Sequence, residues 1–401
     1  MDNSVGPIWD VIGKIEGAEE PEKQVILGNH RDAWVCGAID PNSGTSTLVE
    51  LARGFGELLK QGWKPRRTIV FASWDAEEQG LLGSTEYAED NAEELKEQAV
   101  AYLNVDGTLG PLAAAGGSPS IAKFLFQTAN AIPANDFGGV VAEEKTLYAQ
   151  WMAQTAEQRL SNFTGGTIGP DHLINVLGTG SDFGAFCHHL GIVSANVGFG
   201  LAGGSYGTYH STMDSIMYSE LFADPGYTTH VTTARWWGLL ALRLADNAVL
   251  PLEFSTYALV MNEAVTSFEA ALKTAAKRYP DVDAVDFAEL REAIATFDGN
   301  AKQFHKKLAA VDADASDEEL SYWNDKLMYL ERHLTLDAGL PHRGWYKHVV
   351  FGPGFYDGYG GTAFPGLADG IAFHDDAVAI QSHVDDVVKV LHDAAAFLLS
   401  P

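Results

Sequence analysis

The sequence predicts an α/β fold in which a mixed, largely parallel sheet is sandwiched by helices and followed by an α-helical domain. Three apolar stretches of strand length, at residues 24–30, 68–74 and 100–106, each end in acidic or imidazole side chains. Between the first two, residues 44–60 carry apolar side chains at helical spacing, so strand, helix and strand form a right-handed crossover between parallel strands. From residue 251 onward, long amphipathic segments replace this alternation.

The N-terminal part, residues 1–248, is expected to form the α/β domain. Its other predicted elements are a leading strand or hairpin at 5–17, a helix at 80–97, a glycine-rich loop at 107–120, a helix at 121–131, a long irregular connection at 138–169, a strand at 192–199 and a closing helix at 224–246. Ser181 and Asp182 provide the N-cap signal of one more helix.

The C-terminal part, residues 249–401, is expected to form the helical domain. Apolar residues three and four positions apart predict helices at 257–277, 287–309, 317–334 and 377–399. Residues 340–365 are rich in glycine, proline and aromatic residues, and we expect a loop with exposed surface there.

Composition excludes several classes of protein. A chain of 401 residues is long enough for two folded domains. With 26 basic and 54 acidic residues the formal net charge is −28, which repels phosphate backbones, so nucleic acid is not an expected partner. The longest apolar runs fall short of 18 uncharged residues, and we expect no membrane-spanning segment. Cys36 and Cys187 are too few for a disulfide framework or a thiolate zinc site.

Acidic and imidazole side chains gather at one predicted edge of the sheet. In open α/β sheets, sites lie beyond the carboxyl ends of the parallel strands. The residues expected there are His30, Asp40, Glu77, Glu78 and Asp106, with His210 farther along the chain. Histidine and carboxylate ligands without thiolates suit zinc or a similar divalent ion. Glu77 and Glu78 follow a strand directly and point in opposite directions, so one can bind metal while the other faces a substrate water.

Six motifs carry a resemblance to a known family: HRD at 30–32, GAIDP at 37–41, FASWDAEE at 71–78, LLGSTE at 81–86, YLNVD at 102–106 and YHS at 209–211. Together they closely resemble the glutamate carboxypeptidase II group of zinc peptidases, which also contains the transferrin receptors. The resemblance covers nearly all 401 residues. The helical tail resembles the dimerisation domain of that family, which implies a homodimer.

The resemblance implies two zinc ions bridged by Asp40. The other implied ligands are His30 and Asp106 for one ion and Glu78 and His210 for the other. Glu77 matches the general base of the family, and Asp32 matches a residue that holds the His30 imidazole. Tyr209 matches a tyrosine that donates to the oxyanion. The implied substrate-binding residues are Gly180, Ser181, Asn196 and Tyr359. Glu86 and Glu89 match residues that help to bind a structural calcium ion.

The chain departs from the family pattern in its substrate pocket. Gly358 replaces the lysine that receives a terminal glutamate, although the adjacent Tyr359 is kept. Asn196 and Gly198 replace two arginines, and Ser181 replaces an asparagine. We therefore expect no strict preference for acidic substrates. The family also places a membrane anchor and an apical domain before the matching region, so substrate contacts from the apical domain are expected to be absent from this chain.

The function expected from these residues is hydrolysis of a terminal peptide bond of small peptides by a di-zinc metallopeptidase. One alternative is a non-catalytic receptor or scaffold of the same fold, as in the transferrin receptors, but here all five metal ligands and the general base remain. A second alternative is a zinc aminopeptidase that recognises a free amino terminus. The resemblance implies a secreted, extracellular-facing or vacuolar setting. Finally, the peptide bond between Asp40 and Pro41 is expected to be cis, since proline lowers the cost of that isomer.

Overall fold

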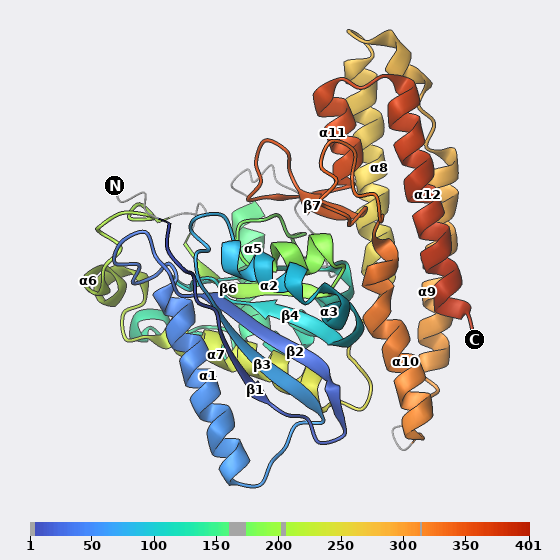
Figure 1. Ribbon diagram of the computed structural model, residues 1–401. Helices are drawn as coiled ribbons and strands as arrows, with labels where there is room; N and C mark the ends of the chain where they lie inside the picture. The colour runs from blue at the N-terminus through green and yellow to red at the C-terminus, as the bar shows by residue number, and fades with distance from the viewer. Residues whose placement is uncertain (1–4, 160–173, 202–205, 313–314) are drawn as a thin grey trace.

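The computed structural model describes residues 5–159, 174–201, 206–312 and 315–401. A six-stranded sheet lies between helical layers, and a group of long helices stands beside it (Figure 1). The α/β fold followed by a helical region is therefore as the sequence predicted. Within the described part of the chain, no helix is both long and apolar enough to cross a bilayer.

The sheet has the strand order β1-β3-β2-β4-β6-β5. Its strands are β1 (Val11–Ile15), β2 (Glu20–His30), β3 (Arg67–Trp74), β4 (Ala99–Asn104), β5 (Leu112–Gly117) and β6 (Ser194–Gly200). The four central strands are parallel, and β1 and β5 are antiparallel edge strands. Because the central strands are parallel, their carboxyl ends meet at one edge, where the metal site was expected.

Helices cover both faces of this sheet. Helices α1 (Asn42–Lys60) and α7 (Thr228–Asp246) lie on one face, and α2 (Leu82–Asp90) and α3 (Ala92–Gln98) lie on the other (Figure 1). All six residues of β4 are buried, as expected for a strand covered on both sides. The remaining helices of this part are α4 (Ala122–Ala129), α5 (Leu147–Arg159) and the short α6 (Ile216–Tyr218).

The start of α1 packs directly against the end of β4. The Asp40–Pro41 peptide bond just before it is cis, as predicted. A Cβ atom at Gly44 would lie 2.2 Å from the backbone oxygen of Asp106, so only glycine allows this approach. The loop that carries Asp40 is thereby held against the strand end that leads to Asp106.

The helical region contains α8 (Ser255–Ala275), α9 (Ala288–Leu308), α10 (Asp317–Tyr329), α11 (Pro365–Phe373) and α12 (Ala377–Leu399). Helix α9 packs along α8 and α12. A two-stranded hairpin of β7 (Phe351–Pro353) and β8 (Gly361–Ala363) contacts α8, and Gly360, just before β8, pairs with Leu177. The four long helices and the loop at 340–365 agree with the sequence, apart from this hairpin.

Two predictions of irregular structure were wrong. The loop at 107–120 contains β5, whose alanines and glycines have low strand propensity but pair along the whole length of β6. The connection at 138–169 contains α5, while its residues 160–169 lie outside the described part. In α5, Gln150 is buried. Its side-chain oxygen accepts a hydrogen bond from the backbone N–H of Asn135, and its side-chain nitrogen donates one to the backbone oxygen of Asn135. A polar residue in a buried position interrupts the apolar period.

Two helix predictions also need correction. The helix at 80–97 is divided into α2 and α3 at Asn91. The helix predicted after Ser181 and Asp182 is present as a short segment that includes the π-helical turn Ala185–His189, but neither residue caps it through its side chain. The Ser181 hydroxyl accepts a hydrogen bond from Asn104 instead. A hydroxyl used in tertiary contacts is unavailable for capping.

Candidate metal centre and substrate cleft

The expected ligands come from five separate segments that converge at the carboxyl edge of the sheet. His30 is the last residue of β2, Glu77 and Glu78 follow β3, and Asp106 follows β4. Asp40 lies in the loop before α1, and His210 lies in the loop after β6. The structure sorts them into two groups, His30 with Glu77 and Asp106, and Asp40 with Glu78 and His210.

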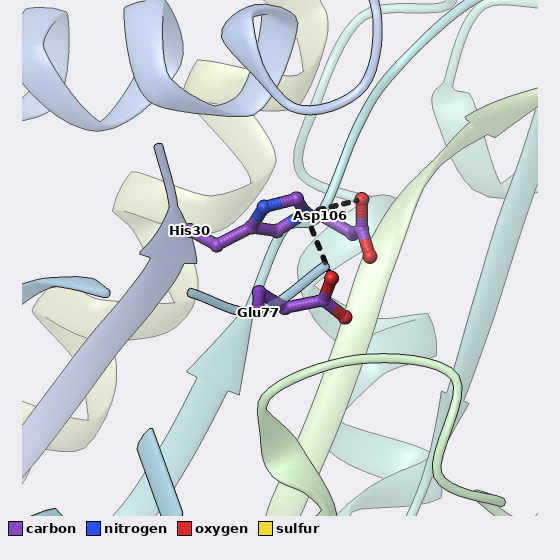
Figure 2. A group of neighbouring side chains, drawn as sticks. All are labelled: His30, Glu77 and Asp106. Carbon is purple, nitrogen blue, oxygen red and sulfur yellow. Dashed lines mark ion pairs between the residues drawn. The ribbon is translucent and has the colours of Figure 1, made fainter. Parts of the chain in front are cut away.

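The first group surrounds a buried imidazole nitrogen (Figure 2). His30 Nε2 lies 3.4 Å from Asp106 Oδ1, 3.4 Å from Asp40 Oδ1 and 3.9 Å from Glu77 Oε2. The same nitrogen is buried and has no hydrogen-bond partner. A buried polar atom left unpaired among carboxylates is costly unless a cation lies between them.

The tautomer of His30 supports this interpretation. His30 Nδ1 lies 3.0 Å from the backbone oxygen of Asp32, to which it donates. In a neutral imidazole the lone pair then lies on Nε2, toward the carboxylates. Burial lowers the pKa of His30, but Asp106 and the other carboxylates outweigh it and raise that pKa well above its usual value. The position therefore favours a positive charge, which a divalent ion would supply.

Asp40 belongs to the second group but also faces His30 of the first. His210 Nε2 lies 3.0 Å from Asp40 Oδ2 and 3.3 Å from Glu78 Oε2. The two oxygens of Asp40 thus face different imidazoles, Oδ1 toward His30 and Oδ2 toward His210. The residues present, imidazoles and carboxylates with their ligand atoms close together, therefore fit divalent metal ions.

The glutamates of the site have raised pKa values. Burial raises the pKa of Glu77 to about 9, and the carboxylates of Asp106 and Asp182 add to the shift. Burial, followed by the charge of Asp40, raises the pKa of Glu78 to about 7. Without cations, Glu77 and Glu78 therefore hold a proton up to a higher pH than a free glutamate does.

Asp32 contacts the His30 imidazole through two of its groups. Its backbone oxygen lies 3.0 Å from His30 Nδ1, and its carboxylate oxygen Oδ1 lies 3.5 Å from the same nitrogen. Its carboxylate oxygens accept the backbone N–H groups of Glu77, at 3.0 Å, and Glu78, at 3.2 Å. Asp32 therefore orients both glutamates as well as the imidazole.

Replacing Asp32 with asparagine is expected to weaken metal binding about 10- to 100-fold, the range for groups that support metal ligands. The asparagine side chain has one oxygen, which can accept from only one of the two backbone N–H groups of Glu77 and Glu78. Its NH2 group would face the other backbone N–H, and two donors cannot form a hydrogen bond. Affinity would be measured by competition with a chromogenic chelator. Asp246→Asn is the matched control, because Asp246 also accepts two N–H groups, from Trp63 and Arg66, away from the metal groups. Equal losses in both variants would show that Asp32 has no special role.

Sequence reasoning missed two buried carboxylates near the site. Asp214 accepts the backbone N–H groups of Ile39, at 2.9 Å, and Asp40, at 3.1 Å, and so anchors the loop of the bridging residue. Asp182 is buried, its two oxygens lack hydrogen-bond partners, and burial raises its pKa to about 7. Asp214 lies four residues after His210, and Asp182 follows Ser181. The sequence around them does not indicate that Asp214 would bind the backbone N–H groups of the Asp40 loop, or that Asp182 would be buried near the charges of the site.

A cavity of about 800 Å³ reaches Gly107, the residue after Asp106. Its lining comes from β5, β6, the segment 174–180, the hairpin at 359–363 and helix α8. Of the residues that the resemblance implies for substrate binding, Gly180, Asn196 and Tyr359 line this cavity, and Ser181 is buried and does not. Tyr209 Oη lies 3.3 Å from Tyr359 Oη, so the two predicted tyrosines meet. The cavity is the candidate substrate cleft.

The cleft carries little charge. Among its described lining residues, Glu263 of α8 is the single charged side chain. An acidic substrate side chain would therefore meet no fixed positive charge from these residues.

Glu86 and Glu89 do not form a comparable group. Neither belongs to a cluster of three or more ligand atoms among the described residues. Glu89 instead accepts a hydrogen bond from Trp345 Nε1 at 2.5 Å. This contact joins α2 to the helical region.

Comparison with known families gives two matches. The model described as peptidase family M28 matches residues 10–221, and the transferrin receptor-like dimerisation domain matches residues 285–399.

Similar curated proteins include a probable glutamate carboxypeptidase, LAMP1, from Arabidopsis thaliana, which is 39% identical over 92% of this chain and 49% of its own length. Aminopeptidase NAALADL1 from Mus musculus is 36% identical over 97% of this chain and 52% of its own length. The chain thus spans about half the length of the curated relatives it matches. Among solved structures, a zinc aminopeptidase from Bacillus subtilis overlaps 60% of this chain and 51% of its own, at 19% identity and a TM-score of 0.41.

Proposed function

We propose, on the premise that this chain belongs to peptidase family M28, that it is a di-zinc exopeptidase that removes a terminal residue from small peptides. The observation that carries the proposal is the pair of ligand groups joined by the two oxygens of Asp40, with Glu77 beside them. His30 and Asp106 would hold one ion and Glu78 and His210 the other. All six side chains are present and close together.

Two zinc ions, when bound, supply Lewis acidity that polarises the scissile carbonyl and lowers the pKa of the attacking water. Glu77 would accept the proton of that water and pass it to the leaving amine, as a general base and then a general acid. Its raised pKa, about 9 without cations, means that it can hold a proton, and nearby cations would lower this pKa toward the working range. Tyr209 would donate a hydrogen bond from its hydroxyl group to the oxyanion.

The alternatives differ in what they require of these residues. A non-catalytic receptor needs neither the full ligand set nor Glu77, and both are retained. An aminopeptidase remains compatible with the site, because the relatives include proteins named for each kind of terminus. The region that matches the dimerisation domain supports a homodimer. We do not extend the proposal to calcium at Glu86 and Glu89, because that ion takes six to eight oxygen ligands.

The direct test is hydrolysis of a peptide library by the metal-loaded protein. We expect about two zinc ions per chain and removal of one terminal residue, and the shortened end identifies carboxy- or aminopeptidase action. Zinc-loaded protein that cleaves no peptide would favour the receptor alternative.

The cleft also predicts a substrate preference. A peptide with a terminal glutamate should be hydrolysed no faster than the same peptide with glutamine. Glu263→Lys should raise the glutamate-to-glutamine ratio of kcat/KM by about two- to fivefold, the effect of one exposed charge pair. Glu16→Lys is the charge-matched control, since Glu16 is exposed and does not line the cleft. A strong preference for glutamate in the wild type would contradict this prediction.

A further inference from the structure

A chain of side-chain hydrogen bonds runs from the core of the sheet to the substrate cleft. Trp74 Nε1 lies 2.9 Å from Tyr102 Oη, which lies 2.9 Å from Asn104 Oδ1. Asn104 Nδ2 then contacts Ser181 Oγ at 2.9 Å and Asn196 Oδ1 at 3.0 Å. The first four residues are almost completely buried, and Asn196 lines the cleft.

Trp74, the first residue in this series of hydrogen bonds, determines which group donates and which accepts at every later step. An indole N–H can only donate, so the Tyr102 oxygen must accept. Burial raises the pKa of Tyr102 well above its usual value, so the hydroxyl keeps its proton and donates it to Asn104 Oδ1. The amide of Asn104 must then direct its nitrogen toward Ser181 and Asn196.

The opposite orientation of Asn104 is disfavoured. Its Nδ2 group would face the Tyr102 oxygen, and the hydroxyl proton of Tyr102 would lose its acceptor in a fully buried place. Leaving a buried donor unpaired costs more than one hydrogen bond contributes. The sequence of donors and acceptors is therefore fixed as far as Asn196.

The packing around Tyr102 holds this arrangement in place. A Cβ atom at Gly28 would lie 2.0 Å from Tyr102 Oη, so the hydroxyl occupies space that only glycine leaves open. On its other side, the ring of Phe186 stacks on Tyr102 with centroids 4.1 Å apart and planes inclined by 9°. Tyr102 therefore has little freedom to turn its hydroxyl away from Asn104.

We propose that this chain of hydrogen bonds sets the polarity of the cleft by committing Asn196 Oδ1 to Asn104, which leaves the two amide N–H groups of Asn196 to bind an oxygen atom of the substrate. Tyr102 and Asn104 are then positioning residues that never touch the substrate. The substrate-binding part rests on the proposed peptidase function. The ligand class is a hydrogen-bond acceptor, a carbonyl or carboxylate oxygen.

The activity test uses the peptide that the wild type hydrolyses fastest. Tyr102→Phe and Asn196→Ala should each raise KM about three- to tenfold, the effect of one hydrogen bond, with kcat changed about twofold or less. The double variant should be little worse than either single one, because both remove the same interaction. Tyr257→Phe is the control, since Tyr257 is also a fully buried tyrosine but lies in α8. Full additivity, or an equal KM change in the control, would overturn the proposal.

The orientation of Asn104 can be tested without any activity. In protein labelled with [15N]asparagine, the side-chain amide protons of Asn104 should exchange with water at least about 100-fold more slowly than those of Asn196, because both protons of Asn104 are bonded and buried. Tyr102→Phe should remove much of this protection, and Tyr257→Phe should not. Rapid exchange of the Asn104 amide protons in the wild type would refute the proposed series of hydrogen bonds, even if peptides are hydrolysed. If no peptide is hydrolysed but the protection is found, the peptidase function fails and the hydrogen-bond chain stands.

Discussion

Glu77→Gln is expected to lower kcat about 10²- to 10⁴-fold, the contribution of a positioned general base, while the variant still binds two zinc ions. The amide has the size and shape of the carboxylate but cannot accept the proton of the attacking water. Activity would be measured as kcat on the fastest peptide of the library, and metal content by mass spectrometry of the dialysed protein.

The metal content of this variant separates two roles for Glu77. Its carboxylate belongs to the same group as His30 and Asp106, so geometry alone would allow it to be a ligand. If it were a ligand, Glu77→Gln would lose an ion together with activity. Glu78→Gln is the control, because Glu78 faces His210 and is the proposed ligand. Loss of metal from Glu78→Gln alone supports the assigned roles, and loss from Glu77→Gln would reverse them.

Removal of the metal ions is expected to cause the largest change in stability and to invert its dependence on pH. An ion that binds only the folded state stabilises it by about 4 kcal/mol when its free concentration is a thousand times its Kd. Two ions would together contribute roughly twice that. Thermal unfolding in the presence of a chelator should therefore begin several degrees lower at pH 8.

The pH dependence follows from the raised pKa values. Those of Glu77, about 9, and Glu78, about 7, lie above the usual 4.5, so the folded metal-free protein binds more protons than the unfolded chain between these limits. Its stability should be highest near pH 4.5 to 5 and should fall as the pH rises through 7 and 9. Metal ions compete with those protons, so their stabilising effect should grow over the same range.

This inversion can be measured by thermal unfolding at several pH values between 5 and 9, with zinc and with a chelator. The double variant Glu77→Gln, Glu78→Gln is the control, because it lacks the two titrating glutamates and its metal-free stability should fall less between pH 5 and 7. Above that range the raised pKa of His30 still gives a fall in stability. A metal-free wild type that becomes more stable as the pH rises would contradict the assignment of these two groups.

The residues of the metal site could be predicted from the sequence because their signal is local. Each apolar strand is followed directly by polar residues, as in Trp74 before Glu77 and Glu78. Parallel strands bring their carboxyl ends to one edge, so a pattern along the chain becomes a cluster in space. The family resemblance then indicated which imidazole and which loop carboxylate complete the two groups.

Other elements were missed because tertiary contacts override weak local preferences. Strand β5 exists because β6 offers it a partner along its whole length. Helix α5 buries Gln150 because Asn135 satisfies its amide. The residues of β5 do not show that β6 will pair with them, and the residues of α5 do not show that Asn135 will bond Gln150. Alternation and periodicity within each segment therefore could not predict β5 or α5.

By itself the sequence determined the order of the strands and helices along the chain, the acidic and imidazole ligands and the glycine at 44 that lets α1 approach Asp106. Tertiary structure alone decided that the Asp32 carboxylate orients two glutamates, that α8 lines the cleft and that Asn196 turns its amide toward it. The physical reason is the direction of hydrogen bonds between distant segments. A residue type states what a group can donate or accept, but only its folded neighbours determine which partner it meets.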